Sequence, residues 1–300
     1  MQNPPRVGFA GLGLMGGRMA RHFITKGFPL AVWNRTPERG QPLVALGAKM
    51  AKTPRELAEM SDVVVTCVAD PNAVGRIVFP DDGVRAAARP GFRYVETSTI
   101  SPGLARRIAE VMRSKGADML EAPVTGSKIG AEKGTLLVMA GGSKEVEQEL
   151  MPVLSAFAAK VIHCGDIGQA STVKLIGNTI ISFMLEGFCE GLVLGRKSGV
   201  SLETILEVVM ASGFASPYYS FKGAAIAKRD FETHFSVDLL VKDQNLMLEE
   251  AHANKVPMPG LASIREVFQS ARAQGWGEED IAAVVKALEK SAGLEQEPRA

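Results

Sequence analysis

Short runs of apolar residues alternate with helical patterns over the first 165 residues of the chain. The runs are rich in β-branched side chains and show little polar alternation, which predicts strands that are covered on both faces. The predicted strands span residues 6–10, 29–33, 61–67, 92–96, 118–121, 136–140 and 161–164. This alternation of strands and helices indicates a doubly wound, mostly parallel sheet.

The pattern changes after Gly165, where the predicted strands end. A helical pattern without proline runs from Gln169 to about Lys197, and further helical segments follow at 201–211, 224–228, 237–253, 261–274 and 278–290. We therefore predict a Rossmann-type α/β domain at 1–165, a long interdomain helix at 166–197 and an all-α C-terminal domain at 198–300. The C-terminal domain is expected to complete the active site.

Three glycines, Gly187, Gly191 and Gly195, lie four residues apart on one face of the long helix. Glycines at this spacing allow another helix to approach closely, and the same pattern occurs in membrane spans. Glu186 and Glu190 interrupt the apolar sequence here. Close helix packing in a soluble protein is therefore the better interpretation.

The first predicted strand leads into a glycine turn and then into a helix. The spacing Gly11-x-Gly13-x-x-Gly16 at this place fits the dinucleotide-binding fingerprint. Gly11 allows the sharp turn, Gly13 lets the backbone approach a pyrophosphate, and Gly16 lets the helix pack close to the strand. Backbone N–H groups at the helix start, around Leu14 and Met15, face the phosphates in such a turn. These five residues are predicted to bind a dinucleotide.

The end of the second predicted strand indicates which nicotinamide cofactor is bound. NAD enzymes usually place Asp or Glu about twenty residues after the glycines, where it accepts the ribose hydroxyls. Here the position holds Asn34, followed by Arg35, whose guanidinium can form charge-assisted bonds to a 2′-phosphate. Thr36 precedes Pro37 and is the predicted N-cap of the next helix. The sequence favours NADP(H), the alternative being a solvated arginine at a strand end.

Two further strand ends carry residues that could line a ligand. Val68 and Ala69 follow the third predicted strand, at the edge where ligands bind in open α/β sheets. The segment 97–101 carries four hydroxyl groups after the fourth strand, and Ser101 is the predicted cap of the next helix. Capping requires one hydroxyl, so it does not account for the cluster.

Composition restricts the class of protein further. The chain is 46% hydrophobic and 22% charged, which is typical of a globular protein, and its net charge of +1 gives no general attraction to nucleic acid or to a membrane. The three cysteines and four histidines lack metal-ligand spacing, so no metal is expected. The odd cysteine count, and a first strand too close to the N-terminus for a signal peptide, predict a cytoplasmic protein.

Lys174 and Asn178 lie one turn apart on the same face near the start of the long helix. Their neighbours Val173, Leu175 and Ile176 are apolar, so this part of the helix is expected to be largely buried. Burial lowers the pKa of a lysine, which suits proton exchange with a substrate oxygen near neutral pH. The alternative is a lysine whose stem lies along apolar neighbours while its ammonium reaches water.

Four separated motifs occur along the chain, namely Gly11-Leu12-Gly13-Leu14-Met15-Gly16, Ala122-Pro123-Val124-Thr125-Gly126-Ser127, Lys174-Leu175-Ile176-Gly177-Asn178 and Lys242-Asp243. This set resembles the β-hydroxyacid dehydrogenase family, which includes 3-hydroxyisobutyrate dehydrogenases and the reductases of tartronate semialdehyde, glyoxylate and succinic semialdehyde. The segments Asn34-Arg35-Thr36, Ser127-Lys128, Ser216-Pro217 and 235–243 look most like the glyoxylate/succinic semialdehyde reductases.

The resemblance implies a role for each matching position. Lys174 is implied as the general acid that protonates the carbonyl oxygen, and as the base in reverse, with Asn178 orienting the substrate and the lysine. The other implied contacts are those of Thr99 to the nicotinamide ribose, Val68 and Ala69 to the cofactor edge, Lys242 over the cofactor, Thr125, Gly126 and Ser127 to the substrate carboxylate, and Phe235 and Asp243 to the substrate end.

The motifs together predict an NADPH-dependent reductase that transfers a hydride to the carbonyl of a small aldehyde acid such as glyoxylate or succinic semialdehyde. A 3-hydroxyisobutyrate or related 3-hydroxyacid dehydrogenase is the enzymatic alternative, although Thr125 and Ser127 replace the serine and the glycine found in many members. A cofactor-binding interaction module is the non-enzyme alternative, and Lys174 disfavours it. The apolar faces of the helical part predict a homodimer or homotetramer.

Overall fold

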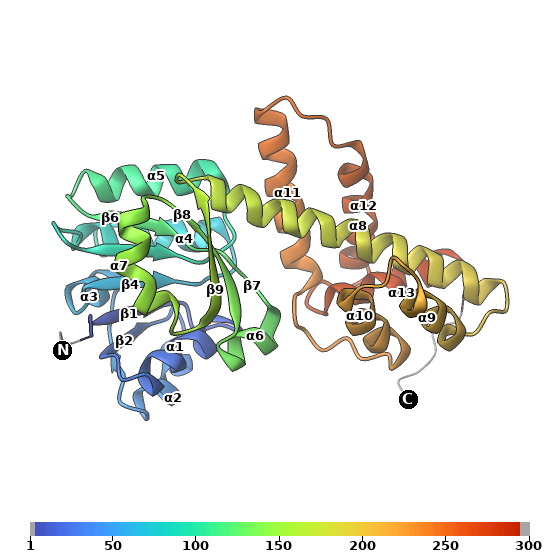
Figure 1. Cartoon of the computed structure of the whole chain (residues 1–300), viewed down its shortest axis with the longest axis horizontal. Coiled ribbons are helices and arrows are strands. Elements are labelled where there is room, and N and C mark those ends of the chain that lie inside the picture. Colours follow the sequence, from blue (N-terminus) through green and yellow to red (C-terminus); the bar gives the residue numbers. More distant parts are fainter. Residues whose placement is uncertain (1–3, 295–300) are drawn as a thin grey trace. The chain divides into compact units, whose positions relative to one another are not determined.

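The computed structural model describes residues 4–294, and the chain divides into two compact units between Leu175 and Ile176. The first unit is a sheet with helices on both faces, and the second consists of helices (Figure 1). The division falls inside the long helix α8 (Gln169–Lys197), which gives its first turns to the sheet unit and the rest to the helical unit. The predicted Rossmann-type fold with an all-α C-terminal part is confirmed.

The sheet has its topological switch point between β1 and β4. Its strand order is β3-β2-β1-β4-β5-β6-β8-β7, with β9 beside β8. All neighbours from β3 to β6 are parallel, whereas β8 runs antiparallel to β6 and β7. The strands are β1 (Val7–Ala10), β2 (Leu30–Trp33), β3 (Lys49–Met50), β4 (Val63–Thr66), β5 (Arg93–Glu96), β6 (Asp118–Glu121), β7 (Val124–Thr125), β8 (Leu136–Gly141) and β9 (Ala158–Gly165). The carboxyl ends of β1 and β4 therefore flank the place where open α/β sheets bind ligands.

Successive residues of the central strands β1 and β4 are buried on opposite faces of the sheet, which explains the apolar runs in the sequence. Val63 and Val65 pack with Phe23 of α1, whereas Val64 packs with Ile108 of α5. The helices of this unit are α1 (Gly16–Thr25), α2 (Gln41–Val44), α3 (Pro54–Glu59), α4 (Pro71–Val78), α5 (Pro102–Arg113), α6 (Ser127–Lys133) and α7 (Lys144–Leu154), with 3₁₀ helices η1 (Pro37–Gly40) and η2 (Val84–Ala86).

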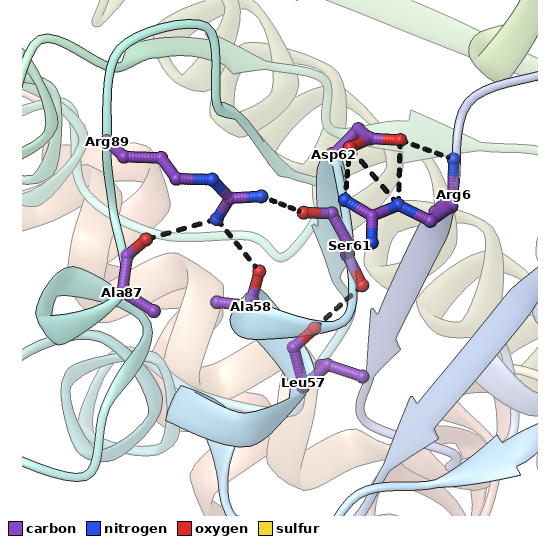
Figure 2. A network of polar contacts seen from close by, with 7 residues as sticks. All are labelled: Arg6, Leu57, Ala58, Ser61, Asp62, Ala87 and Arg89. Atoms are coloured by element: carbon purple, nitrogen blue, oxygen red, sulfur yellow. Dashed lines mark hydrogen bonds and ion pairs between the residues drawn. The ribbon is translucent and has the colours of Figure 1, made fainter.

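Polar contacts tie together the amino ends of β1 and β4 (Figure 2). The Arg6 guanidinium pairs with the Asp62 carboxylate at 2.6 Å and lowers the pKa of that carboxyl, mainly through the hydrogen bond. The Arg89 guanidinium donates to the carbonyl oxygens of Ser61 at 2.8 Å and of Ala58 and Ala87 at 3.2 Å. This edge of the sheet serves stability, and the opposite, carboxyl edge carries the predicted site residues.

The helical unit has a core of its own. Leu185, Phe188 and Leu192 of α8 are buried in it with Val237 and Phe268. Besides α8, its helices are α9 (Leu202–Ala211), α10 (Pro217–Ala227), α11 (Val237–Ala253), α12 (Pro259–Ala273), η3 (Ile281–Ala283) and α13 (Val284–Ser291). The start of α10 lies seven residues before the predicted segment 224–228. Aromatic residues with low helix propensity obscured a start that Ser216 caps by accepting from the Tyr218 amide at 3.0 Å.

Among residues 4–294, α8 alone is long and apolar enough to cross a membrane by length and composition, with a mean hydropathy of 1.2 in its most apolar window. The close approach of a helix expected at its glycines occurs at Gly195, where a Cβ would overlap Ile205 of α9. A Cβ at Gly187 or Gly191 would meet no atom within 4 Å in the described chain. Those two glycines therefore lie on an open part of the helix surface.

Candidate active site

The three fingerprint glycines occupy distinct environments at the carboxyl end of β1. Gly11 has a φ of +96°, and a Cβ there would overlap the Cys67 carbonyl oxygen, so the turn requires glycine. A Cβ at Gly16 would overlap the Gly11 carbonyl oxygen, which shows how closely α1 approaches the turn. A Cβ at Gly13 would meet nothing within 4 Å. Gly13 thus leaves the open surface that a pyrophosphate needs.

The backbone amides at the start of α1 are suited to bind an anion. The first turn is closed by hydrogen bonds from Gly17 to the Gly13 carbonyl at 3.1 Å and from Met19 to the Met15 carbonyl at 3.0 Å. The amides of Gly13, Leu14 and Met15 have no acceptor within the described part of the chain. Such amides, with the positive end of a helix dipole, form a ready site for phosphate.

Asn34 joins the glycine turn to the end of β2. Its Oδ1 accepts from the Leu12 amide at 2.8 Å, and its Nδ2 donates to the Thr36 carbonyl at 2.8 Å. The Arg35 side chain is exposed beside it. The predicted cap by Thr36 is wrong, because its hydroxyl accepts no hydrogen bond from the next helix. That helix is the four-residue η1, in which Arg39 N donates to the Thr36 carbonyl at 3.2 Å.

Hydroxyl groups fasten the ends of β4 and β5 to each other. The Ser98 Oγ accepts from the Val68 amide at 2.9 Å, and the Thr97 hydroxyl donates to the Thr66 carbonyl at 2.7 Å. Ala69 follows Val68 and is exposed at the same edge. The backbone at 68–69 is thereby held next to the glycine turn, because β4 neighbours β1.

Ser101 caps α5 as predicted, with its Oγ accepting from the Leu104 amide at 3.2 Å. Three of the four hydroxyls in the segment 97–101 therefore hold the local structure together. Thr99 is half-buried between them, and its contact to a nicotinamide ribose stays a prediction.

Glu96, at the end of β5, was not anticipated from the sequence. Its side chain is 1% exposed, and it accepts from the Tyr94 hydroxyl at 2.7 Å and from the Ser98 amide at 2.8 Å. Burial raises the pKa of Glu96 to about 7. The carboxyl group thus supports Ser98, which in turn holds Val68. An acidic residue that directly follows the apolar pair Tyr94-Val95 at a strand end is the signal that could have indicated it.

The turn at 125–127 has an unusual backbone. Gly126 has a φ of +134° and Ser127 a φ of +58°, a left-handed conformation that costs a non-glycine residue roughly 1–2 kcal/mol. Thr125 and Gly126 are exposed, and Ser127 begins α6. Strained backbone with exposed polar groups is typical of ligand-binding turns. The turn could therefore hold a carboxylate, as the resemblance implies.

The start of α8 is fastened to the end of β6 by Glu121, a second residue that the sequence did not indicate. Its Oε1 accepts from the amides of Gly168 at 2.6 Å and Ala170 at 2.9 Å, and its Oε2 accepts from the Ser171 hydroxyl at 2.6 Å and amide at 3.3 Å. The Glu121 side chain is 1% exposed, and burial raises the pKa of its carboxyl. The sheet thus fixes the first turn of α8.

Lys174 lies one turn beyond this anchor and is half-buried. Leu175 is 1% exposed, but Val173 and Ile176 are 41% and 48% exposed. The expected burial of this segment is therefore wrong for two of the three apolar neighbours, because only one face of α8 packs against its unit. Lys174 sits at the border between that buried face and the open one.

Three residues implied by the resemblance come together in the helical unit. The Asn178 side-chain amide donates to Asp243 Oδ2 at 2.5 Å, and the Lys242 ammonium lies 2.6 Å from Asp243 Oδ1. Asn178 and Asp243 are 6% and 2% exposed. Asp243 thus holds two other predicted site residues.

Phe235 is half-buried in the segment before α11. The backbone amides of His234 and Phe235 donate to Asp280 Oδ2 at 3.1 and 3.2 Å, and Asp280 Oδ1 pairs with the buried Lys222 ammonium at 2.6 Å. The Lys222–Asp280 pair therefore fixes the backbone that presents Phe235. Over residues 4–294, no group of three or more His, Cys, Asp or Glu side chains is placed to hold a metal ion.

Comparison with known proteins identifies the family of both parts of the chain. Residues 6–165 match the family described as the NAD binding domain of 6-phosphogluconate dehydrogenase. Residues 168–288 match the family described as NAD-binding of NADP-dependent 3-hydroxyisobutyrate dehydrogenase. The boundary between the two matches, at residues 166–167, lies just before the start of α8 at Gln169.

Individual relatives match over nearly their whole length. Glyoxylate/succinic semialdehyde reductase 1 of Arabidopsis thaliana is 34% identical, over 95% of this chain and 99% of that protein. The 2-(hydroxymethyl)glutarate dehydrogenase of Eubacterium barkeri is 33% identical, over 98% of both chains. The crystal structure of 3-hydroxyisobutyrate dehydrogenase from Salmonella typhimurium superposes with a TM-score of 0.85 at 32% identity, over 94% of this chain and 99% of that one.

These matches decide for an enzyme over a cofactor-binding module, because the relatives reported above, which match over nearly their whole length, are named dehydrogenases and reductases. The glycine turn, with open space at Gly13 and amides suited to a phosphate, fits the nicotinamide cofactor of such enzymes. The chain belongs to the β-hydroxyacid dehydrogenase family and is an oxidoreductase that acts on CH–OH groups with a nicotinamide cofactor.

Proposed function

We propose that the protein is an NADPH-dependent reductase of small aldehyde acids, with glyoxylate and succinic semialdehyde as substrates. The main observation is that the glycine turn and the helix of Lys174 both start at the carboxyl edge of the parallel strands β1 to β6. The turn follows β1, and the start of α8 is held by Glu121, the last residue of β6. Parallel strands place both features on the side where such sheets bind ligands.

In this proposal Lys174 is the general acid. It donates a proton to the carbonyl oxygen, which becomes the hydroxyl of the product, and it regains a proton from solvent. The bound nicotinamide cofactor supplies the hydride that adds to the carbonyl carbon. In the reverse direction Lys174 accepts the hydroxyl proton. Its place at the border of a buried face suits a group that must meet substrate and still exchange protons with water.

Residues around the glycine turn would hold the cofactor. The amides of Gly13, Leu14 and Met15 fit the pyrophosphate, and the exposed Arg35 fits a 2′-phosphate. Arg39, also exposed in η1, offers a second guanidinium near the same strand end. No carboxylate stands at the position that binds the ribose hydroxyls in NAD enzymes, which favours NADPH over NADH.

The turn at 125–127 would hold the substrate carboxylate. The strained Ser127 backbone and the two exposed residues before it offer amides and hydroxyls to an anion. The Thr125 methyl group reduces the space beside that anion, which favours unbranched acids over the branched 3-hydroxyisobutyrate. The roles of Thr99, Phe235, Lys242 and Asp243 at the cofactor and substrate are proposed on the family resemblance.

The direct test is oxidation of NADPH and of NADH with glyoxylate, succinic semialdehyde and methylmalonate semialdehyde. We expect fast turnover of one of the first two with NADPH. Faster turnover of the branched semialdehyde with NADH would assign the alternative, a 3-hydroxyisobutyrate dehydrogenase. Lys174→Ala should reduce turnover to a small residual rate, about 10²- to 10⁴-fold below the wild type, while NADPH still binds. Unchanged turnover in that variant would refute the role of Lys174.

We further propose that the protein is a homodimer or homotetramer. On α8 in the helical unit, Ile180 is 54% exposed, Phe183 45% and Leu194 67%, and the surface at Gly187 and Gly191 is open. A second copy of the chain fits such an apolar, close-approach face. Light scattering should give a multiple of 32.0 kDa, and Ile180→Glu should shift it towards the monomer. We also propose a cytoplasmic location, since Cys67, Cys164 and Cys189 are all free thiols.

A further inference from the structure

The Glu121 side chain crosses the neighbouring strand to reach α8. Glu121 pairs with Gly141 of β8, and a Cβ at position 141 would overlap the Glu121 carboxylate. Gly141 in turn pairs with Gly165 at the end of β9, just before α8 begins. Gly141 thus leaves the space through which the carboxylate extends from β6 to the helix start, whereas a Cβ at Gly165 would overlap the side chain of Gln169 in α8 itself.

This anchor differs from the other helix starts of the chain. Ser101, Ser143 and Ser201 each cap their own helix through a hydroxyl that accepts from an amide three residues later. At α8, a carboxylate 47 to 50 residues earlier in the chain accepts from three backbone amides and one hydroxyl. A charged acceptor that binds several amides of a helix start is also stabilised by the helix dipole. The four hydrogen bonds of Glu121 therefore fix both the position and the orientation of the first turn of α8.

Both predicted substrate-handling features are tied to this one residue. Lys174 lies three residues after Ser171, on the same helical face, and the turn at 125–127 begins four residues after Glu121 on the continuing chain. The side chain of Glu121 thus holds the helical turn that precedes Lys174, while its backbone leads directly to the turn at 125–127.

We propose that Glu121 is the positioning residue of the active site, fixing the first turn of α8 so that the Lys174 ammonium stands in register with the turn at 125–127. This inference rests on the proposed function, because it requires Lys174 to be the proton donor. The Glu121 carboxylate is buried and bound to α8, so in this proposal it acts on the substrate through Lys174. Its effect is on the geometry of Lys174 and so on kcat.

The first test compares Glu121→Gln and Ser171→Ala with a matched control, Ser143→Ala. In Glu121→Gln, the side-chain NH2 group cannot accept a hydrogen bond from a backbone amide of α8. The helix start therefore loses part of its anchor, while the side chain at position 121 keeps its size and shape. We expect Glu121→Gln to lower kcat by about 10- to 100-fold and Ser171→Ala by about 3- to 10-fold, with the Kd of NADPH changed less than about threefold. Ser143→Ala removes the cap of α7 and should leave kcat unchanged.

The second test places Glu121→Gln, or Ser171→Ala if the first does not fold, in the Lys174→Ala background. If the anchor acts through Lys174, the second substitution should change the residual rate by less than about twofold. Losses that multiply in the double variant, or a kcat loss no larger than in Ser143→Ala, would overturn the positioning role and leave the proposed function intact. Unchanged turnover in Lys174→Ala alone would refute the proposed function and, with it, this inference.

Discussion

Asp243 uses both oxygens of a buried carboxylate to hold two other residues of the predicted site. Its Oδ2 accepts from the Asn178 amide at 2.5 Å, and its Oδ1 pairs with the Lys242 ammonium at 2.6 Å. The resemblance implied that Asp243 shapes the substrate end. The contacts show in addition that it orients Asn178 on α8 and Lys242 on α11.

We predict that Asp243→Asn lowers kcat/KM by about 10- to 100-fold, because one side of the new amide turns a donor towards Asn178 or Lys242 and leaves a buried group without its partner. The free energy of unfolding should fall by roughly 1–3 kcal/mol for the same reason. Asp238→Asn is the control, since Asp238 lies on the same helix in an exposed pair with Arg272. Equal effects of the two substitutions would contradict the assigned role.

Arg35→Ala should discriminate between the two nicotinamide cofactors. Loss of charge-assisted hydrogen bonds to a 2′-phosphate, worth about 1.5–3 kcal/mol, should raise the KM for NADPH by roughly 10- to 100-fold. The KM for NADH should change by less than about twofold, because that cofactor lacks the phosphate. Arg21→Ala removes an exposed arginine of α1 and should affect neither. A similar rise for both cofactors would show that Arg35 does not recognise the phosphate.

Alanine at two fingerprint glycines should separate folding from cofactor binding. In Gly16→Ala the Cβ overlaps the Gly11 carbonyl oxygen, so we expect a loss of roughly 1–3 kcal/mol of unfolding free energy. In Gly13→Ala the Cβ meets nothing within 4 Å, so stability should change by less than about 0.5 kcal/mol. Its methyl group would instead stand where the pyrophosphate approaches, and fluorescence titration should show weaker NADPH binding. Tight NADPH binding by Gly13→Ala would place the pyrophosphate elsewhere.

Glu96 should make folding stability depend on pH. Its pKa is raised from 4.5 to about 7 by burial, so between these values the folded chain holds the proton more firmly than the unfolded chain. Stability from this group is therefore lost as pH rises from about 4.5 to about 7, by roughly 3 kcal/mol in total, and the loss persists above that range. Glu96→Gln lacks this titrating group. In urea unfolding, its free energy of unfolding relative to that of the wild type should therefore rise from about pH 4.5 to about pH 7. Parallel curves for the two proteins would mean that Glu96 is not buried as a carboxyl.

The sequence predicted most strands to within a few residues, because a continuous run of β-branched residues such as Val63–Thr66 is typical of a strand buried on both faces of a parallel sheet. The glycine turn was equally predictable, since the structure gives Gly11 and Gly16 surroundings that exclude any side chain. Asn34 was placed correctly at the strand end, but its bond to the Leu12 amide was not foreseen. That hydrogen bond depends on the relative position of the glycine turn and the end of β2, which the sequence of neither segment indicates alone.

The residues that support the site were the part that sequence patterns could not supply. In the sequence, Glu121 and Glu96 are acidic residues at the ends of short strands, and nothing there indicates their partners Ser171 and Ser98. These contacts form only when the sheet and α8 are assembled. The exposure of Val173 was missed for the same reason, because it too depends on which elements pack against α8. Helical periodicity identifies an apolar face, but it does not tell whether another element of the chain covers that face.

The passage of the Glu121 side chain over Gly141 also constrains how these positions can vary among relatives. Any side chain at position 141 would occupy the space that the Glu121 carboxylate now fills. Relatives with a larger residue there should carry a shorter or apolar residue at position 121 and fasten the start of α8 in another way. The two sites, on neighbouring strands, are thus expected to covary, and aligned relatives with Glu at position 121 should carry Gly at position 141.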